Sequence, residues 1–569
     1  MGTGGLVDWR GKPINTKVHG GVRAAWFLYF LVVVNYLVQS PNLHNLVTYL
    51  RGVMHMGVAD ASTTVTNFIG AMCAFALLGA FLSDSYINSA RTLLMSALLV
   101  ILGLVLLAMQ AHHPSLHPPQ CNPQEPSSCN AVHGWNATLL YVALYIMAVG
   151  EGFMRACIPA LGADQFDGDD PSESRQQSSF FNWFAFCLSV GVISGLILIV
   201  WVQNSVGWFV GFGLSALITL IGFMVAAAGL PFYRNRVPQG SALTRVVQVF
   251  VVAFKNRKDV PPEKIEEARG NIDGADSQDV PQYTKSLTFL DKACINNGKD
   301  GAWSMCDISK VEETKIVLGL LPLVISSMVA HVSSPLLVAF TVQQGAMTNT
   351  RLGRLHFYPA MLAIVPNVFQ LLLLVTYDRV LVPFLRRRTG YVGGITQLQR
   401  VAVGFTANIF APIVAAIVER KRKDMAAAGA QMSIFWLAPQ YFLLGMQETT
   451  SFVGLLEFFN SEAPDGMKSI GVALFWCQTG LSSFLGTLIV RLVNKVTRQG
   501  GTLGWVEGKN LNRTHLDLFY WLVAAVAFLG WLNFLYWAKR YKYRHDPRIA
   551  TKPVDEDTQP EVLRQPHEP

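Results

Sequence analysis

Long apolar runs recur along the whole chain, and they constrain its fold more than any other feature. Each run has roughly the 20 residues that a helix needs to cross a lipid bilayer. Backbone polar groups inside a bilayer must be satisfied within the protein, so runs of this length predict helices. The composition agrees, because 51% of the 569 residues are hydrophobic and 14% are charged, against about 25% charged in soluble domains. The predicted spans lie near residues 24–49, 60–83, 92–110, 138–160, 180–202, 208–230, 316–340, 356–378, 397–418, 434–458, 470–492 and 516–538.

The twelve spans fall into two groups of six, separated by a charged segment rich in Pro, Gly and Asp. We therefore predict an all-α membrane protein with twelve transmembrane helices in two six-helix bundles. The Lys and Arg near both termini and in the central segment predict that these parts face the cytoplasm. The basic run 420–423 would then face outside, against that bias. The predicted segments are a cytoplasmic N-terminal segment (1–22), the first bundle (23–230), a cytoplasmic linker (231–313), the second bundle (314–538) and a cytoplasmic tail (539–569).

The residue pattern argues against several classes of function. The net charge of +8 is scattered along the chain, so nucleic acid is not an expected partner. The eight cysteines have no metal-ligand spacing, and there is no Walker-type loop or nucleophile–base constellation. We expect no cofactor, no metal site and no enzyme activity. Cys121 and Cys129 lie in a polar loop beside the glycosylation sequon at Asn136, which indicates an external loop; their spacing leaves a disulfide open.

Three sequence motifs narrow the type of membrane protein further than hydropathy does. They read GADQFD at 162–167, SSFFNWF at 178–184 and SEAPDGM at 461–467. These motifs closely resemble the signature of the proton-coupled oligopeptide transporters, in the form found in the plant nitrate transporter 1/peptide transporter family. The resemblance extends from VDWRGKP (7–13) to LDLFYW (516–521). It implies a major facilitator fold, with a solute site at mid-membrane between the two bundles.

Glu151 and Arg155 stand four residues apart in the fourth span, so a helix places them on one face. Charges inside a membrane segment are costly unless they pair or face the bundle interior. By the resemblance, Arg155 replaces a Lys of the family, and Arg can bind a carboxylate through two hydrogen bonds. We expect a Glu151–Arg155 pair that opens to bind a substrate carboxylate. The alternatives are a permanent structural ion pair and interfacial positions at the end of the span.

Proton coupling is the property in which this sequence departs most from the family pattern. Most members carry two carboxylates and a basic residue in the first span, and these positions read Val32, Asn35 and Tyr36 here. Asn35 can bond either a solute or a neighbouring helix. Glu448 lies in the middle of the tenth span, where an ionised carboxylate is costly and proton uptake is favoured. We expect Glu448, with Glu151 as a second group, to carry any proton coupling.

Further candidate ligands lie in the seventh, tenth and eleventh spans. Ser334 occupies the position at which nitrate-transporting members use a His, and His331 lies one turn earlier on the same face. His331 can titrate near neutral pH, although a lone His in an apolar helix also fits a buried structural role. Tyr441 and Trp476 are candidate apolar walls for a bulky solute, with ordinary packing as the alternative.

The residues that differ from the family pattern favour a weakly acidic, largely apolar solute. After FFNWF the family usually continues with a Tyr and an Asn, whereas this chain has Ala185 and Ser189. The opening VDWRGKP resembles the branch that includes abscisic-acid and gibberellin importers. We expect a secondary active transporter of a small organic acid in the plasma membrane, with a plant hormone as the favoured solute and protons as the candidate coupling ion. A nitrate or peptide symporter, an uncoupled facilitator and a non-transporting sensor are the alternatives.

Overall fold

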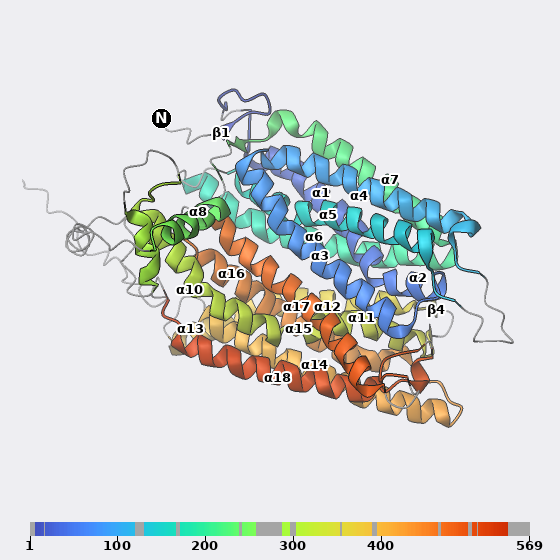
Figure 1. Cartoon of the computed structure of the whole chain (residues 1–569). Coiled ribbons are helices and arrows are strands. Elements are labelled where there is room, and N and C mark those ends of the chain that lie inside the picture. Colours follow the sequence, from blue (N-terminus) through green and yellow to red (C-terminus); the bar gives the residue numbers. More distant parts are fainter. Residues whose placement is uncertain are drawn as a thin grey trace, which may run out of the picture.

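The computed structural model describes residues 6–15, 18–119, 130–166, 171–237, 240, 242–257, 287–295, 303–352, 355–389, 395–464, 468–498, 503–508 and 510–543. The described part is mostly helical (Figure 1). Cys121, Cys129 and most of the predicted linker and tail lie outside these ranges. The structure therefore does not test whether Cys121 and Cys129 form a disulfide.

The first half of the chain crosses the molecule in long apolar helices. The first crossing consists of α1 (Gly21–His44) and α2 (Leu46–Gly52), which meet at Asn45. Before α4 (Ser89–His112), the Asn88 side chain accepts a hydrogen bond from the backbone N–H of Arg91, an N-cap that satisfies an otherwise free donor. The other helices of this half are α3 (Val58–Ser85), α5 (Gly134–Ala163), α6 (Pro171–Ser205) and α7 (Trp208–Ala228).

In the second half, two predicted spans are helices interrupted by a π-helical turn. In the first, α12 (Ile364–Thr376) continues through the turn η6 (Tyr377–Leu381) into α13 (Val382–Thr389). In the second, α15 (Ala438–Gln447) continues through the turn η8 (Glu448–Phe452) into α16 (Val453–Glu462). The other long helices are α10 (Ile308–Ala330), α11 (Ser333–Ala346), α14 (Gln397–Ala427), α17 (Lys468–Thr497) and α18 (Leu516–Arg540).

Among the described residues, 10 helical segments are long and apolar enough to cross a membrane. They match all the predicted spans except 356–378 and 434–458, and these two correspond to the interrupted helices. The predicted all-α membrane architecture is therefore confirmed, and the structure is consistent with twelve crossings.

Short elements connect the long helices. Strand β1 (Leu6–Val7) pairs antiparallel with β2 (Asn235–Arg236), which docks the N-terminal segment beside the chain that follows α7. Strand β3 (Arg351–Leu352) pairs with β4 (Leu355–His356). The remaining elements are α8 (Ala242–Lys255) and the 3-10 turns η1 (Pro114–Leu116), η3 (Leu230–Phe232), η4 (Thr288–Cys294), η5 (Pro359–Ala363), η7 (Ile434–Leu437) and η10 (Leu511–Arg513).

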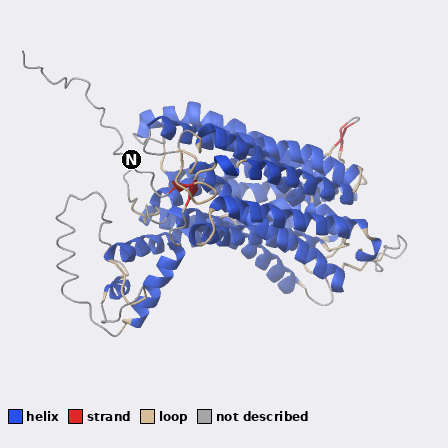
Figure 2. Cartoon of the chain, turned by 90° about the horizontal axis from the view of Figure 1, so that it is seen from above, coloured by secondary structure: helices blue, strands red, loops and turns tan. Residues whose placement is uncertain are grey.

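The two halves lie side by side, with the blue-to-green helices of the first half above the yellow-to-red helices of the second (Figure 1). We call the end that carries β1 and α8 the linker end, and the opposite end, with α2 and β4, the far end. The two short strand pairs lie at opposite ends of the helical body (Figure 2). The long helices therefore run between one end that carries the β1–β2 pair and another that carries the β3–β4 pair.

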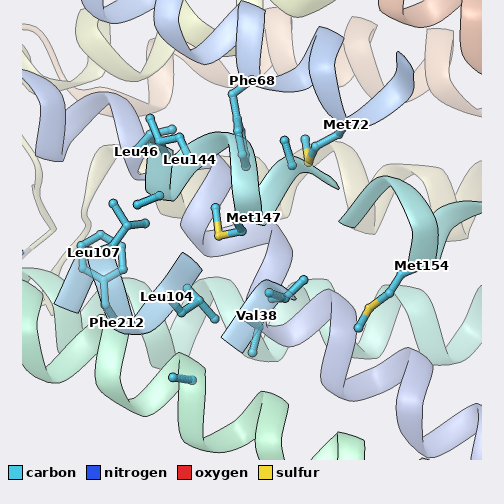
Figure 3. Packing of buried hydrophobic residues seen from close by; sticks show 14 of the residues in the cluster. Val38, Leu46, Phe68, Met72, Leu104, Leu107, Leu144, Met147, Met154 and Phe212 are labelled. Atoms are coloured by element: carbon cyan, nitrogen blue, oxygen red, sulfur yellow. The ribbon is translucent and has the colours of Figure 1, made fainter. Parts of the chain in front are cut away.

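Close packing of apolar side chains fixes the position of α5 within the first half. Val38, Met72, Leu104, Met147 and Phe212 meet there from five different helices (Figure 3). Small residues bring the backbones together: a Cβ at Gly150 would lie 2.7 Å from the Ser96 carbonyl oxygen, and one at Gly152 would lie 2.6 Å from that of Met72. Such small-residue contacts are typical of membrane helix packing. They hold the intervening Glu151 at a fixed place.

Two of the four basic residues in the run 420–423 are paired with carboxylates, and a third lies over an aromatic ring. The buried Arg422 donates two hydrogen bonds, of 2.8 and 2.7 Å, to the Glu419 carboxylate. Lys423 lies 2.6 Å from the Asp517 carboxylate, and the Lys421 ammonium lies 3.6 Å from the centroid of the Trp436 ring. A basic side chain that is paired with a carboxylate adds no net positive charge to its loop. The pairing therefore offers a physical reason for the exception to the positive-inside bias.

Candidate functional site between the two halves

Arg155 on α5 connects the two halves of the molecule. Its guanidinium carbon lies 4.9 Å from the centroid of the Trp476 ring on α17. The Arg155 Nε is buried and has no hydrogen-bond partner in the structure. A cation over an aromatic face gains about 0.5–2 kcal/mol, whereas a buried charge left without its partner costs about 3–5 kcal/mol. Arg155 thus presents unsatisfied donor capacity at the interface between the halves.

Two acidic side chains lie within electrostatic range of Arg155, one from each half. Glu151 and Glu448 both interact with its charge, yet neither forms an ion pair with it among the described residues. The prediction of a closed Glu151–Arg155 pair is therefore wrong for this structure. The physical reason is that the long Arg155 side chain extends across the interface to Trp476, whereas Glu151 is only 2% exposed and points an unpartnered Oε2 into the packed helices.

The turn η8, which begins at Glu448, also contacts Trp476. Phe452, the last residue of η8, packs edge-on against Trp476 with 5.9 Å between ring centroids. The hydroxyls of Thr449, Thr450 and Ser451 donate back to carbonyl oxygens four residues earlier. Such back-bonding loosens a regular helix, and π-helical turns occur frequently at functional sites. The hydroxyl run at 449–451 was the sequence signal for this turn.

The first helix contributes polar but uncharged groups. Asn35 is 7% exposed, and its side chain makes no hydrogen bond within the described ranges. The neighbouring Tyr36 interacts electrostatically with both Arg155 and Glu151. Helix-to-helix bonding, the alternative role considered for Asn35, is not formed in this structure. Its role as a solute ligand stays a prediction.

The seventh span is broken between α10 and α11, at His331 and Val332. Pro335 explains the break, because its ring lacks an N–H and would clash with the carbonyl four residues earlier, which is that of His331. The backbone N–H of Ser334 instead donates to the His331 carbonyl over 3.1 Å. The expectation that these two side chains share one face of a continuous helix is therefore wrong.

His331 has a partner that the sequence did not reveal. Its Nδ1 lies 3.2 Å from the Gln447 amide nitrogen, which also donates to the Ser451 hydroxyl over 2.8 Å. This contact ties the break in the seventh span to η8. Tyr441 is 1% exposed within the apolar core of the second half, and its hydroxyl has no described partner. The site roles of His331, Ser334 and Tyr441 stay predictions.

The far end of the interface is closed by hydrogen bonds between the halves. Gln343 of α11 donates to the Ser62 hydroxyl over 2.5 Å. The Thr487 hydroxyl of α17 bonds the Thr66 hydroxyl over 2.7 Å and donates to the side-chain amide oxygen of Asn67 over 2.8 Å. These contacts join α3 to two helices of the second half.

Known proteins share both the sequence and the fold. A model of the POT family matches residues 90–506. Protein NRT1/PTR FAMILY 4.3 of Arabidopsis thaliana is 36% identical over 97% of this chain and 95% of its own length. Protein NRT1/PTR FAMILY 4.5 of the same plant is 37% identical over 95% of this chain and 96% of its own length.

Solved structures agree with the fold. An auto-inhibited POT family peptide transporter superposes with a TM-score of 0.66 at 19% identity, covering 91% of this chain and 97% of that one. A POT family transporter in complex with 5-aminolevulinic acid gives a TM-score of 0.63 at 13% identity, covering 93% of this chain and 99% of that one. The resemblance seen in the motifs is confirmed, and with it the major facilitator fold. The chain belongs to the POT family of multi-pass membrane transporters.

Proposed function

We propose that this protein is a secondary active transporter of a small organic acid, and that Arg155 binds the carboxylate of the solute. The observation that carries the proposal is the position of Arg155. It lies at the interface between the halves, stacks on Trp476 and has no ion-pair partner among the described residues. An arriving carboxylate would supply the missing partner through charge-assisted hydrogen bonds. A relative of known structure is in complex with 5-aminolevulinic acid, which is a small organic acid.

The aromatic ring against Arg155 and the uncharged residues at two positions of the first helix favour a bulky, weakly polar acid over nitrate or a peptide. Trp476 of the second half lies against Arg155 and Phe452 packs on Trp476, and Val32 and Asn35 replace the charged groups usual in the first helix. We therefore place a plant hormone, abscisic acid or a gibberellin, first among the solutes.

Protons are the proposed coupling ion, with Glu448 as the carrier and Glu151 as a second titrating group. Glu448 lies in the same electrostatic environment as Arg155 but on the other half. A solute carboxylate bound to Arg155 would weaken the attraction between Arg155 and Glu448. Proton uptake by Glu448 and solute binding would then favour each other.

The proposed cellular setting is the plasma membrane, with both termini and the linker in the cytoplasm. The β1–β2 pair and α8 lie at one end of the molecule, which would be the cytoplasmic end (Figure 1). The closed far end would then face outside.

An uptake panel in oocytes tests the proposal. Cells expressing the protein are given labelled nitrate, a dipeptide, abscisic acid or a gibberellin, at external pH 5.5 and 7.5, with an Arg155→Ala variant as the matched control. We expect uptake of one organic acid that is faster at the lower pH and lost in the variant. Uptake of nitrate or the dipeptide alone, or uptake that Arg155→Ala leaves unchanged, would contradict the proposal.

A second candidate function follows from the loss of the first-helix carboxylates at Val32 and Asn35. Without them, the chain could act as an uncoupled facilitator or a non-transporting sensor. The same panel separates the candidates. A facilitator would equilibrate the acid equally at both pH values, and a sensor would bind it without uptake.

A further inference from the structure

A cavity that opens to the surface lies toward the far end, and Arg155 does not line it. It has a volume of about 400 Å³, and α3 and α5 of the first half line it together with Arg491 of the second half. Its walls combine the carboxylate of Asp60, the Thr63 hydroxyl and the Asn67 amide with the rings of Tyr141 and Tyr145. The cavity is therefore polar, aromatic and shared by both halves.

The two charged residues of this cavity have opposite signs and come from opposite halves. Asp60 lies in the first turn of α3, and Arg491 lies on α17. Both residues are exposed, and among the described residues neither side chain forms an ion pair or a side-chain hydrogen bond. Two unpaired charges facing one cavity fit a ligand that carries both an amine and an acidic group. Each ligand charge would then meet its complement, and the rings of Tyr141 and Tyr145 would flank the ammonium group.

The cavity adjoins the hydrogen bonds that close the far end. Asn67 both lines the cavity and accepts a hydrogen bond of 2.8 Å from Thr487 of α17. Thr487 and Arg491 lie four residues apart on α17, so they share one helix face. A molecule held between Asp60 and Arg491 would therefore add a bond across the same interface.

We propose that this cavity is a regulatory site for a small zwitterion, a molecule with an ammonium group and a carboxylate or phosphate, and that its occupancy holds the far end closed. The regulatory part rests on the proposed transport function, since transport requires the far end to open. A ligand that contacts both halves binds the closed state better than the open one, and so shifts the population toward closure. The same head chemistry occurs in a free amino-acid-like solute and in an ethanolamine phospholipid.

Binding to the purified full chain, in detergent free of phosphatidylethanolamine, tests the site without any transport step. The probes are dialanine, for a free solute, and glycerophosphoethanolamine, for a lipid headgroup, each measured by titration calorimetry. We expect at least one probe to bind, with the Kd raised tenfold or more by Asp60→Asn and by Arg491→Gln. Lys495→Gln removes the same charge one turn farther along α17, outside the cavity, and should leave the Kd unchanged. The probe that binds more tightly identifies the source of the ligand.

The proposal is overturned if neither probe binds, or if Arg155→Ala abolishes binding while Asp60→Asn and Arg491→Gln keep it. The latter result would place the probe in the central site. The probe that binds is then added at saturating concentration on the side of the membrane that the far end faces. It should slow solute uptake severalfold in the native protein and leave uptake by Arg491→Gln unchanged. Equal uptake with and without the probe would refute the regulatory role, even with the site occupied.

Discussion

Removal of the Lys315 ammonium should destabilise the protein more than removal of any exposed lysine. Lys315 lies on α10 with a side chain that is 0% exposed. Its Nζ lies 2.7 Å from Asp291 of η4 and 2.8 Å from Glu312 of α10, and these carboxylate side chains are 6% and 3% exposed. One buried cation thus holds two buried carboxylates. It also ties the linker turn η4 to the first helix of the second half.

The magnitude follows from the burial. Breaking a buried ion pair by removing one partner costs about 3–5 kcal/mol, because a buried charge is left uncompensated. Lys315→Met should therefore lower the free energy of unfolding by about that amount. The matched control is Lys310→Met on the same helix, where the lysine is 40% exposed and lies 3.5 Å from an Asp307 that is 72% exposed. An exposed pair of this kind contributes about 0–1 kcal/mol.

The assay is unfolding by sodium dodecyl sulfate in mixed micelles, followed by tryptophan fluorescence. The triple variant Asp291→Asn, Glu312→Gln, Lys315→Met removes all three charges and should recover most of the lost stability, because buried ionic groups can be replaced by neutral ones at little cost. If Lys315→Met loses no more stability than Lys310→Met, the electrostatic reasoning is refuted. If the triple variant is as unstable as the single one, packing of the lysine stem dominates instead.

Three further predictions concern binding, pH and orientation. Arg155→Lys keeps the charge but loses the planar fork, so the apparent affinity for the solute in uptake assays should fall about 10- to 150-fold, the equivalent of about 1.5–3 kcal/mol; an unchanged affinity would exclude a bidentate contact. The Gly504 backbone N–H and the Arg498 guanidinium hold the pKa of Glu507 below its ordinary value. The ionised Glu507 therefore stabilises the loop 503–508 fully above about pH 4.5, and this stabilisation is lost as the pH falls through the lowered pKa. Hydrogen-exchange protection of the loop should fall in acid in the native protein. In Glu507→Gln the protection should not depend on pH in this range. A cysteine introduced at Gln124 should react with an impermeant maleimide added outside intact cells, whereas labelling only after permeabilisation would reverse the proposed orientation.

The transmembrane architecture was predictable because its signal is local. Each span needs only its own apolar residues, so the runs in the sequence matched the helices of the structure. The break at His331 was also encoded locally, by Pro335, but the assumption of one regular helix hid it. The helix interruption at Glu448 contains a run of hydroxyl residues. A hydropathy profile counts these residues as only weakly polar, so it shows one continuous span.

The contacts of the candidate site could not be predicted, because they join residues far apart in the sequence. Arg155 meets Trp476 across the two halves, and a spacing argument favoured the nearer Glu151 instead. The bond between His331 and Gln447 and the cluster around Lys315 are likewise products of folding. Partner identity in such cases depends on how helices pack, which no single stretch of sequence contains.

Reconstitution into liposomes with the single substitution Glu448→Gln tests the central proposal most directly. The measurement is accumulation of the solute found in the uptake panel, with and without an inwardly directed proton gradient, beside solute exchange at equal pH. The amide mimics the protonated carboxyl, so Glu448→Gln should abolish gradient-driven accumulation while exchange continues at a similar rate. Accumulation by Glu448→Gln against a solute gradient at acidic external pH would contradict the proposal and place proton coupling elsewhere.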